Sequence, residues 1–252
     1  MSSLAISFVV FAVVFGGALT GMLLRSSLPQ HHLSGDSKET VKLGMALVST
    51  MSALVLGLLV SSAKSFYDVQ SAELNQVSAD VVTLDRLLAH YGPETKEARE
   101  ALRVTVVRNL DRLWPTREGT QASEAPLAER SAEALLDELQ ALSPKDDKQR
   151  SLQAQALSIA LNVGRMRWLM YEQSNASVSK TLLVVMIFWL VVVFVSFGLF
   201  APRNATAIAS LFAAAGAVSG AIFLILEMYM PFSGLIKISS APLRTALAHL
   251  GQ

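Results

Sequence analysis

One face of the apolar segment between Lys42 and Lys64 carries small and hydroxyl side chains that could line a path for ions. On a helical wheel these side chains occupy about a third of the circumference. We call them the small-residue stripe, which consists of Lys42, Ala46, Ser49, Thr50, Ala53, Gly57, Val60, Ser61 and Lys64. Hydroxyls and exposed backbone can partly replace the hydration shell of an ion, and lysines at both ends attract anions. The stripe therefore predicts an aqueous pathway that favours anions.

The stripe has a second interpretation, which is packing against another helix. Small residues are common where helices meet in lipid, and Ser and Thr can bond to their own backbone four residues earlier. Considered alone, the stripe fits packing more often than a pore, since such seams are the commoner use of small residues. Four helices cannot both enclose and shield a conduit. A pore therefore requires several copies of the chain around an axis.

The stripe belongs to one of four apolar segments, each long enough to cross a bilayer. A hydrocarbon core of roughly 30 Å needs about 20 helical residues, and lipid requires every backbone amide to be bonded internally. The segments are residues 4–24, 43–63, 181–201 and 205–226. The pairs Gly17 and Gly21, and Gly216 and Gly220, have the four-residue spacing that allows close helix packing. We predict an all-α integral membrane protein with four transmembrane helices.

Charge is concentrated in the middle of the chain. Residues 64–180 hold 15 of the 21 Lys and Arg and 17 of the 20 Asp and Glu. This pattern predicts a first helix pair (1–63), a cytoplasmic helical domain (64–180), a second helix pair (181–226) and a cytoplasmic C-terminal tail (227–252). Basic residues near the membrane ends favour this side by six to four, which places both termini in the cytoplasm. A net charge of +1 without a basic stripe argues against nucleic acid as a partner.

The positions of Gly and Pro divide the polar part into elements. We expect a loop over 25–41 and a second membrane helix that continues into water until Gly92-Pro93. Further elements are expected at 94–114 (helix), 115–126 (linker), 127–142 (helix), 146–180 (helix continuous with the third membrane helix), 231–234 (turn) and 242–250 (short helix).

Three carboxylates invite a functional interpretation. Glu73 and Asp80 lie seven residues apart on one side of the long helix and could form a cytoplasmic vestibule that binds cations. The alternative, more common for such residues, is a solvated flank or a pair with an arginine of a neighbouring helix. Glu227, at the end of the last apolar segment, is expected to reach toward the membrane interface.

Catalytic motifs do not occur in the sequence. There is no nucleophile elbow, Walker loop, HExxH or dinucleotide glycine pattern, and no cysteine. His31 and His32 adjoin in a loop with no third ligand nearby, so we expect no metal site. We predict that the protein is not an enzyme and holds no cofactor.

Two stretches resemble bestrophin-like bacterial membrane proteins. The first is Leu56-Gly57-Leu58-Leu59-Val60 followed by Ser65-Phe66-Tyr67-Asp68 and Ala72-Glu73, and the second is Pro-Phe-Ser-Gly-Leu-Ile-Lys-Ile-Ser at 231–239. The layout is also similar over nearly the whole chain: two apolar helices, a polar domain that grows from the second, then a tight apolar hairpin. The resemblance to bestrophins implies a pentameric, anion-selective channel whose pore is lined by the second membrane helix.

The sequence departs from bestrophins at three places. The basic residue and asparagine that follow the bestrophin pore helix are not reproduced around Ala63-Lys64-Ser65. The zone that is narrow and bulky in bestrophin pores is small-sided here, at Ala53, Gly57 and Ser61, and no acidic residue follows Glu227, so we expect no calcium clasp. The combined expectation is a homopentameric channel whose partners are the lipid bilayer, its own copies and permeant ions including chloride. The alternative is a non-conducting scaffold or signal transducer that recruits a partner through its cytoplasmic helical domain.

Overall fold

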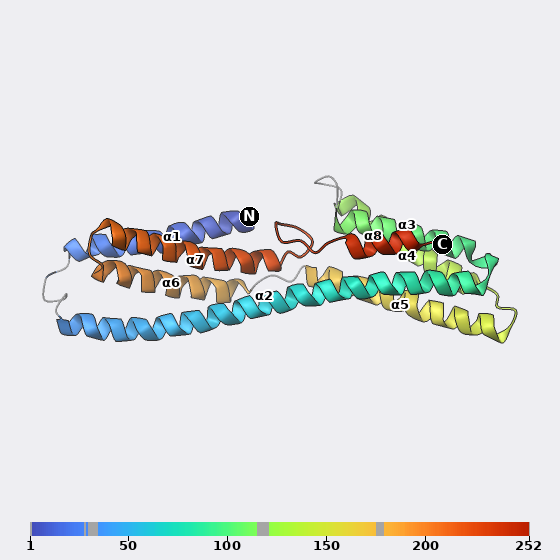
Figure 1. Cartoon of the computed structure of the whole chain (residues 1–252), viewed down its shortest axis with the longest axis horizontal. Coiled ribbons are helices and arrows are strands. Elements are labelled where there is room, and N and C mark those ends of the chain that lie inside the picture. Colours follow the sequence, from blue (N-terminus) through green and yellow to red (C-terminus); the bar gives the residue numbers. More distant parts are fainter. Residues whose placement is uncertain (1, 28, 30–34, 115–120, 175–178, 252) are drawn as a thin grey trace. The chain divides into compact units, whose positions relative to one another are not determined.

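Helices form every regular element in the part of the chain that the structure describes. This computed structural model describes residues 2–27, 29, 35–114, 121–174 and 179–251; His31 and His32 lie outside these ranges. The elements in chain order are α1 (Ser3–Ser27), α2 (Gly35–Tyr91), the 3₁₀ turn η2 (Pro93–Thr95), α3 (Lys96–Leu113), α4 (Gln121–Ala141), α5 (Asp147–Ser174), α6 (Lys180–Phe200), α7 (Ala205–Met228) and α8 (Ala241–His249) (Figure 1). The predicted all-α fold is confirmed.

The chain divides into two compact units that are discontinuous in sequence. The membrane unit comprises Met1–Tyr67 and Ser177–Met230, and the helical unit comprises Asp68–Ala176 and Pro231–Gln252. Four helices are long and apolar enough to cross a membrane, and all four run through the membrane unit. α2 contributes its first part to the membrane unit and its second part to the helical unit, as one helix of 57 residues.

In the membrane unit, α1 packs closely against α6 and α7 (Figure 1). Gly21 lies so near α6 that a Cβ there would collide with the carbonyl of Val195, and a Cβ at Gly198 would collide with the carbonyl of Ala18. The close helix packing predicted for the first glycine pair is therefore confirmed, with α6 as the partner. The second pair, Gly216 and Gly220 on α7, has no described atom within 4 Å of the place that a Cβ would occupy.

Two arginines join the ends of α1, α6 and α7. Arg203, in the α6–α7 turn, donates to the carbonyl of Met22 at 2.6 Å, and Arg25 donates to the carbonyl of Ala201 at 2.7 Å. The side chain of Asn204 accepts from the amide of Ala207 at 2.8 Å and so caps α7. These bonds satisfy backbone groups that a helix end leaves without partners.

The core of the helical unit draws on α2, α3, α4, α5 and α8. Its buried side chains include Leu84, Leu88, Leu102, Val106, Leu139, Ala156, Leu243 and Ala246. The predicted turn and short helix near the C-terminus are present, and α8 packs directly on α3. The indole of Trp114 donates to the carbonyl of Ile238 at 3.0 Å and meets the ring of Phe232 edge-on. Residues 231–251 thus complete this core.

Three predicted boundaries are wrong, and two of them concern helix starts. α2 begins at Gly35, inside the expected loop, and Glu39 lies near the start of the helix, where the helix dipole favours negative charge. α4 begins at Gln121 and includes Pro126, since one proline removes a single main-chain bond among good helix formers.

The third concerns the expected single helix over 146–180, which is two helices. α5 ends at Ser174, and Ser179 caps α6 by accepting from the amide of Leu182 at 3.5 Å. The sequence at 174–179 contains neither Gly nor Pro, so neither residue type marked the end of α5.

Candidate ion pathway along α2

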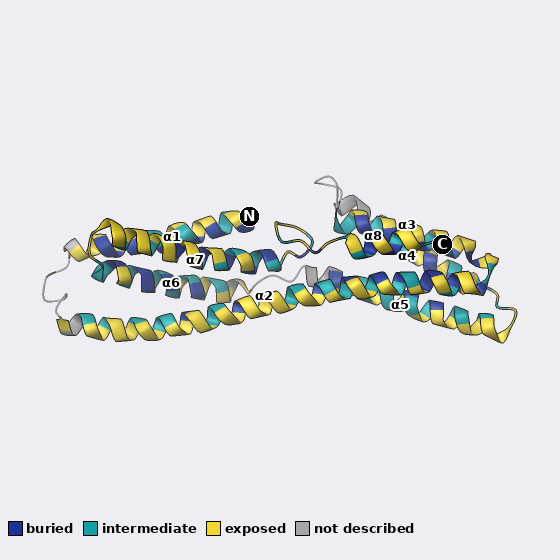
Figure 2. Cartoon of the chain, viewed as in Figure 1, coloured by how far each residue is buried: buried dark blue, intermediate teal, exposed yellow. Residues whose placement is uncertain are grey.

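The membrane part of α2 has three faces with different surroundings. One face packs on the core of the membrane unit through Ser52, Leu59 and Ala63, which are buried. Only 11% of the most apolar stretch of α2 is buried, against 33% for α1. Figure 2 accordingly shows this part of α2 mostly exposed. Most of its surface is therefore available to lipid, water or another copy of the chain.

The second face is the small-residue stripe, and no other described part of the chain covers it. All its members are exposed except Ser49, which is half-buried. A Cβ at Gly57, near the middle of the stripe, would have no described atom within 4 Å. The stripe therefore does not serve as a packing seam between helices of the same chain in the described residues.

The third face is bulky and apolar. Leu43, Leu47, Leu54 and Leu58 point outward with 65–74% of their surface exposed. On a wheel this face lies next to the stripe and opposite the buried face. A helix with one face on its own unit, one small and polar face and one bulky apolar face has the pattern required of a wall helix in a ring of subunits.

Hydroxyl groups of α2 bond mainly to their own helix. Thr50 donates to the carbonyl of Ala46 at 2.9 Å, and Ser52 donates to the carbonyl of Val48 at 2.8 Å. The Oγ of Ser49 is buried and has no partner among the described residues. The bonded hydroxyls keep their oxygens available as acceptors while their protons satisfy backbone carbonyls.

The two lysines of the stripe lie close to one bilayer thickness apart. Lys42 and Lys64 are separated by 22 positions on one helix, or roughly 33 Å at 1.5 Å per residue. Both are exposed, and the ammonium of Lys64 lies 6.0 Å from the ring centroid of Tyr67. The two positive charges are therefore separated by about the thickness of a hydrocarbon core.

Beside Lys64, α2 contacts the end of α7. Ser62 and Tyr229 share a hydrogen bond of 3.1 Å between their hydroxyls, and the rings of Phe66 and Tyr229 stack at 5.1 Å. Sequence reasoning did not identify Tyr229. The available signal was an aromatic residue directly after a membrane helix, where such side chains commonly lie at the interface.

The proposed vestibule carboxylates are half-buried and bonded to amides. Asp80 accepts from Gln76 at 2.9 Å and, across to α5, from Asn162 at 3.2 Å. Glu73 accepts from the amide nitrogen of Gln70 at 3.4 Å. The vestibule stays a prediction.

Two acidic groups differ from expectation or were not foreseen. Glu227 is buried within the membrane unit at 3% exposure, so the expectation that it reaches toward the interface is wrong. Asp85 is buried in the helical unit beside Arg99, a pair that sequence spacing did not reveal. Among the described residues, no three His, Asp or Glu side chains are grouped as metal ligands.

These features define a polytopic helical membrane protein in which one long helix serves both units. A family model for the Bestrophin-like domain matches residues 12–243, which is nearly the whole chain. The protein belongs to this family, and the resemblance inferred from the sequence is confirmed. No curated protein matches the chain significantly.

Proposed function

We propose that the protein is a homopentameric ion channel of the bacterial inner membrane that conducts anions such as chloride, with α2 lining the pore. Membership in the Bestrophin-like family supports a membrane role. The observation that carries the proposal is the small-residue stripe, which the rest of the described chain leaves uncovered. The N-terminus, the helical unit and the C-terminus lie in the cytoplasm in this proposal.

A small, polar helix face gains little from contact with lipid. Glycine and serine expose the helix backbone, and lysine is costly within hydrocarbon, so such faces turn toward protein or water. The bulky face beside the stripe is suited to lipid or a neighbouring subunit. If the stripe of each copy faces a common axis, the stripe can line a water-filled space there. Such an arrangement requires a closed ring of subunits.

The exposed small residues of α7 support self-association. Ala213, Gly216, Ala217 and Gly220 form an exposed row with the spacing of a close helix contact. Unlike Gly21, which packs on α6, neither glycine of this row has a described atom within 4 Å of its Cβ position. A neighbouring subunit is the partner that such a row accommodates best.

Purified protein in liposomes tests conduction and the lining face together. We expect chloride efflux from wild-type vesicles, its loss in Gly57→Trp, and its retention in Gly44→Trp. Gly44 is a matched control because it lies on the same helix, on a different face, and also has no described atom within 4 Å of its Cβ position. Native mass spectrometry of each variant should give five copies.

Each outcome is decisive for one part of the proposal. Folded wild-type protein without ion flux overturns conduction and favours the scaffold alternative. Equal loss of flux in both tryptophan variants overturns the assignment of the stripe to the pore, and another subunit number overturns the pentamer.

A further inference from the structure

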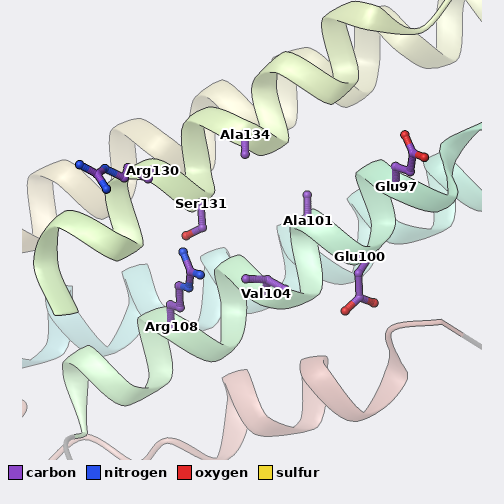
Figure 3. Close-up of a pocket in the computed structure, with 8 residues that line it drawn as sticks. All are labelled: Glu97, Glu100, Ala101, Val104, Arg108, Arg130, Ser131 and Ala134. Carbon is purple, nitrogen blue, oxygen red and sulfur yellow. The ribbon is translucent and has the colours of Figure 1, made fainter.

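A pocket of about 350 Å³ lies between α3 and α4 in the helical unit. Its lining residues are Glu97, Glu100, Ala101, Val104, Arg108, Arg130, Ser131 and Ala134 (Figure 3). This volume is within the range of small-molecule sites. We propose that the pocket binds a small organic monoacid, with the carboxylate at its arginine end.

The arginine end of the pocket has the chemistry of an anion site. Arg108 of α3 and Arg130 of α4 are 22 residues apart in sequence, yet Figure 3 shows both at the same end, with the Arg108 guanidinium directed toward Ser131 and the Arg130 guanidinium directed outward. Guanidinium groups stay charged at every physiological pH and bond carboxylates through several N–H donors.

The pocket wall at this end is held in place by a buried contact between α3 and α4. The hydroxyl of Thr105 donates to the carbonyl of Ser131 at 2.9 Å, and both residues are buried. This bond fixes the backbone of α4 against α3 beside the two arginines. Arg108 and Arg130 are thus presented from helices that are already packed, which lowers the ordering cost of binding.

The middle and the far end of the pocket restrict what else the ligand carries. Ala101, Val104 and Ala134 form a small apolar floor, which suits a short hydrocarbon body. Glu97 and Glu100 line the other end, although Glu100 turns away from the pocket and contacts Arg103 at 3.5 Å. The carboxylate of Glu97 there repels a second acid group, so a monoacid should bind better than a diacid.

Hexanoate, hexanamide, adipate and inorganic phosphate are suitable probes for the full-length chain in a nonionic detergent. By calorimetry or ligand-detected NMR we expect saturable hexanoate binding, and binding of the other three weaker by roughly tenfold or more. Arg108→Gln and Arg130→Gln should each weaken hexanoate binding by about tenfold. Val104→Trp should block it by filling the floor, without a change in charge.

The control variant is Arg86→Gln, an exposed arginine of α2 outside the pocket, which should stay within about twofold of wild type. Circular dichroism of each variant separates lost binding from lost folding, and Val104→Trp tests the pocket if an arginine variant fails to fold. Equal binding of hexanamide, phosphate or adipate overturns the monoacid assignment. Undiminished binding in Val104→Trp, or no saturation below about 10 mM, overturns the site.

Discussion

Arg99 of α3 holds Asp85 of α2 through two parallel bonds, from Nε to Oδ1 at 2.7 Å and from Nη2 to Oδ2 at 2.9 Å. The amide of Gly251 donates to the same Oδ2 at 3.2 Å. The Asp85 side chain is 5% exposed and that of Arg99 is 25% exposed. One carboxylate therefore joins α2, α3 and the C-terminal residues of the helical unit.

Asp85→Asn should destabilise the helical unit by about 2–3 kcal/mol, because Arg99 loses its charged partner in a mostly buried position. The partial exposure of Arg99 keeps the loss below that of a fully buried pair. Thermal unfolding followed by circular dichroism measures it. Asp147→Asn is the control, since its pair with Arg150 is exposed and should be worth less than about 0.5 kcal/mol. Equal effects of the two variants would contradict the role of burial.

Gly21→Ala should weaken the contact between α1 and α6 by about 1–3 kcal/mol, because the added methyl collides with the backbone carbonyl of Val195. Gly16→Ala on the same helix is matched in chemistry but has no described atom within 4 Å of its Cβ position, so it should be neutral or slightly stabilising. Unfolding in mixed micelles compares the two. If Gly21→Ala unfolds like wild type, α1 and α6 can move apart at this contact without loss of stability.

The ion pair of Lys145 and Glu94, whose Nζ and Oε1 lie 2.5 Å apart, should make the free energy of unfolding depend on pH. The hydrogen bond from Lys145 lowers the pKa of Glu94 from its ordinary 4.5, and the bond to Glu94 raises the pKa of Lys145 from 10.5. The Glu94 contribution is therefore present above pH 4.5 and lost as pH falls through the lowered pKa. The Lys145 contribution is present below pH 10.5 and lost as pH rises through the raised pKa.

Lys145→Gln should accordingly lower the melting temperature most at neutral pH, with the difference from wild type shrinking toward both extremes. The shift is small because both groups face solvent. Lys148→Gln, another exposed lysine of the same segment, serves as the control. A difference that stays constant from acid to alkaline pH would exclude this linkage.

Trp114→Phe should release residues 231–251 from the helical unit more often, because it removes the bond to Ile238 and reduces the contact with Phe232. We expect a loss of about 1 kcal/mol and faster cleavage of this segment in limited proteolysis. Trp168→Phe changes an exposed tryptophan of α5 and should leave the cleavage rate unaltered. Similar rates for the two variants would show that Trp114 does not hold the segment.

If α2 lines an anion pore, Lys42→Glu and Lys64→Glu should each lower the ratio of chloride to sodium permeability by at least about threefold, since each reverses a charge near one mouth. Reversal potentials in planar bilayers under a salt gradient measure this ratio. Arg150→Glu reverses an exposed charge on α5 and should not change it. An unchanged permeability ratio in both lysine variants would show that neither lysine lies beside the ion path.

The sequence predicted the long helices well because their signals are strong. Four apolar runs of membrane length, and the absence of Gly and Pro after Gly57 until Gly92, are sufficient to specify α2 as one helix through both units. The end of α5 was missed because neither Gly nor Pro, the strongest helix-breaking signals, follows Ser174 before α6 begins.

The candidate sites could be predicted from the sequence only in part. The stripe is periodic along one helix and is visible on a wheel, whereas Arg108 and Arg130 line one pocket only because α3 and α4 pack together. The same holds for Tyr229, whose bond to Ser62 spans 167 positions. Periodicity reveals the face of one helix, but not which face of another helix lies opposite.

The helical unit is assembled from two stretches separated in sequence by α6 and α7. A ribosome makes residues 68–176 first, then both apolar helices, and only afterwards Leu243 and Ala246, which complete the core. During synthesis part of the apolar surface of the earlier stretch therefore stays uncovered until α6, α7 and residues 231–251 have been made. Chaperones thus have an interval in which to act on the unfinished chain.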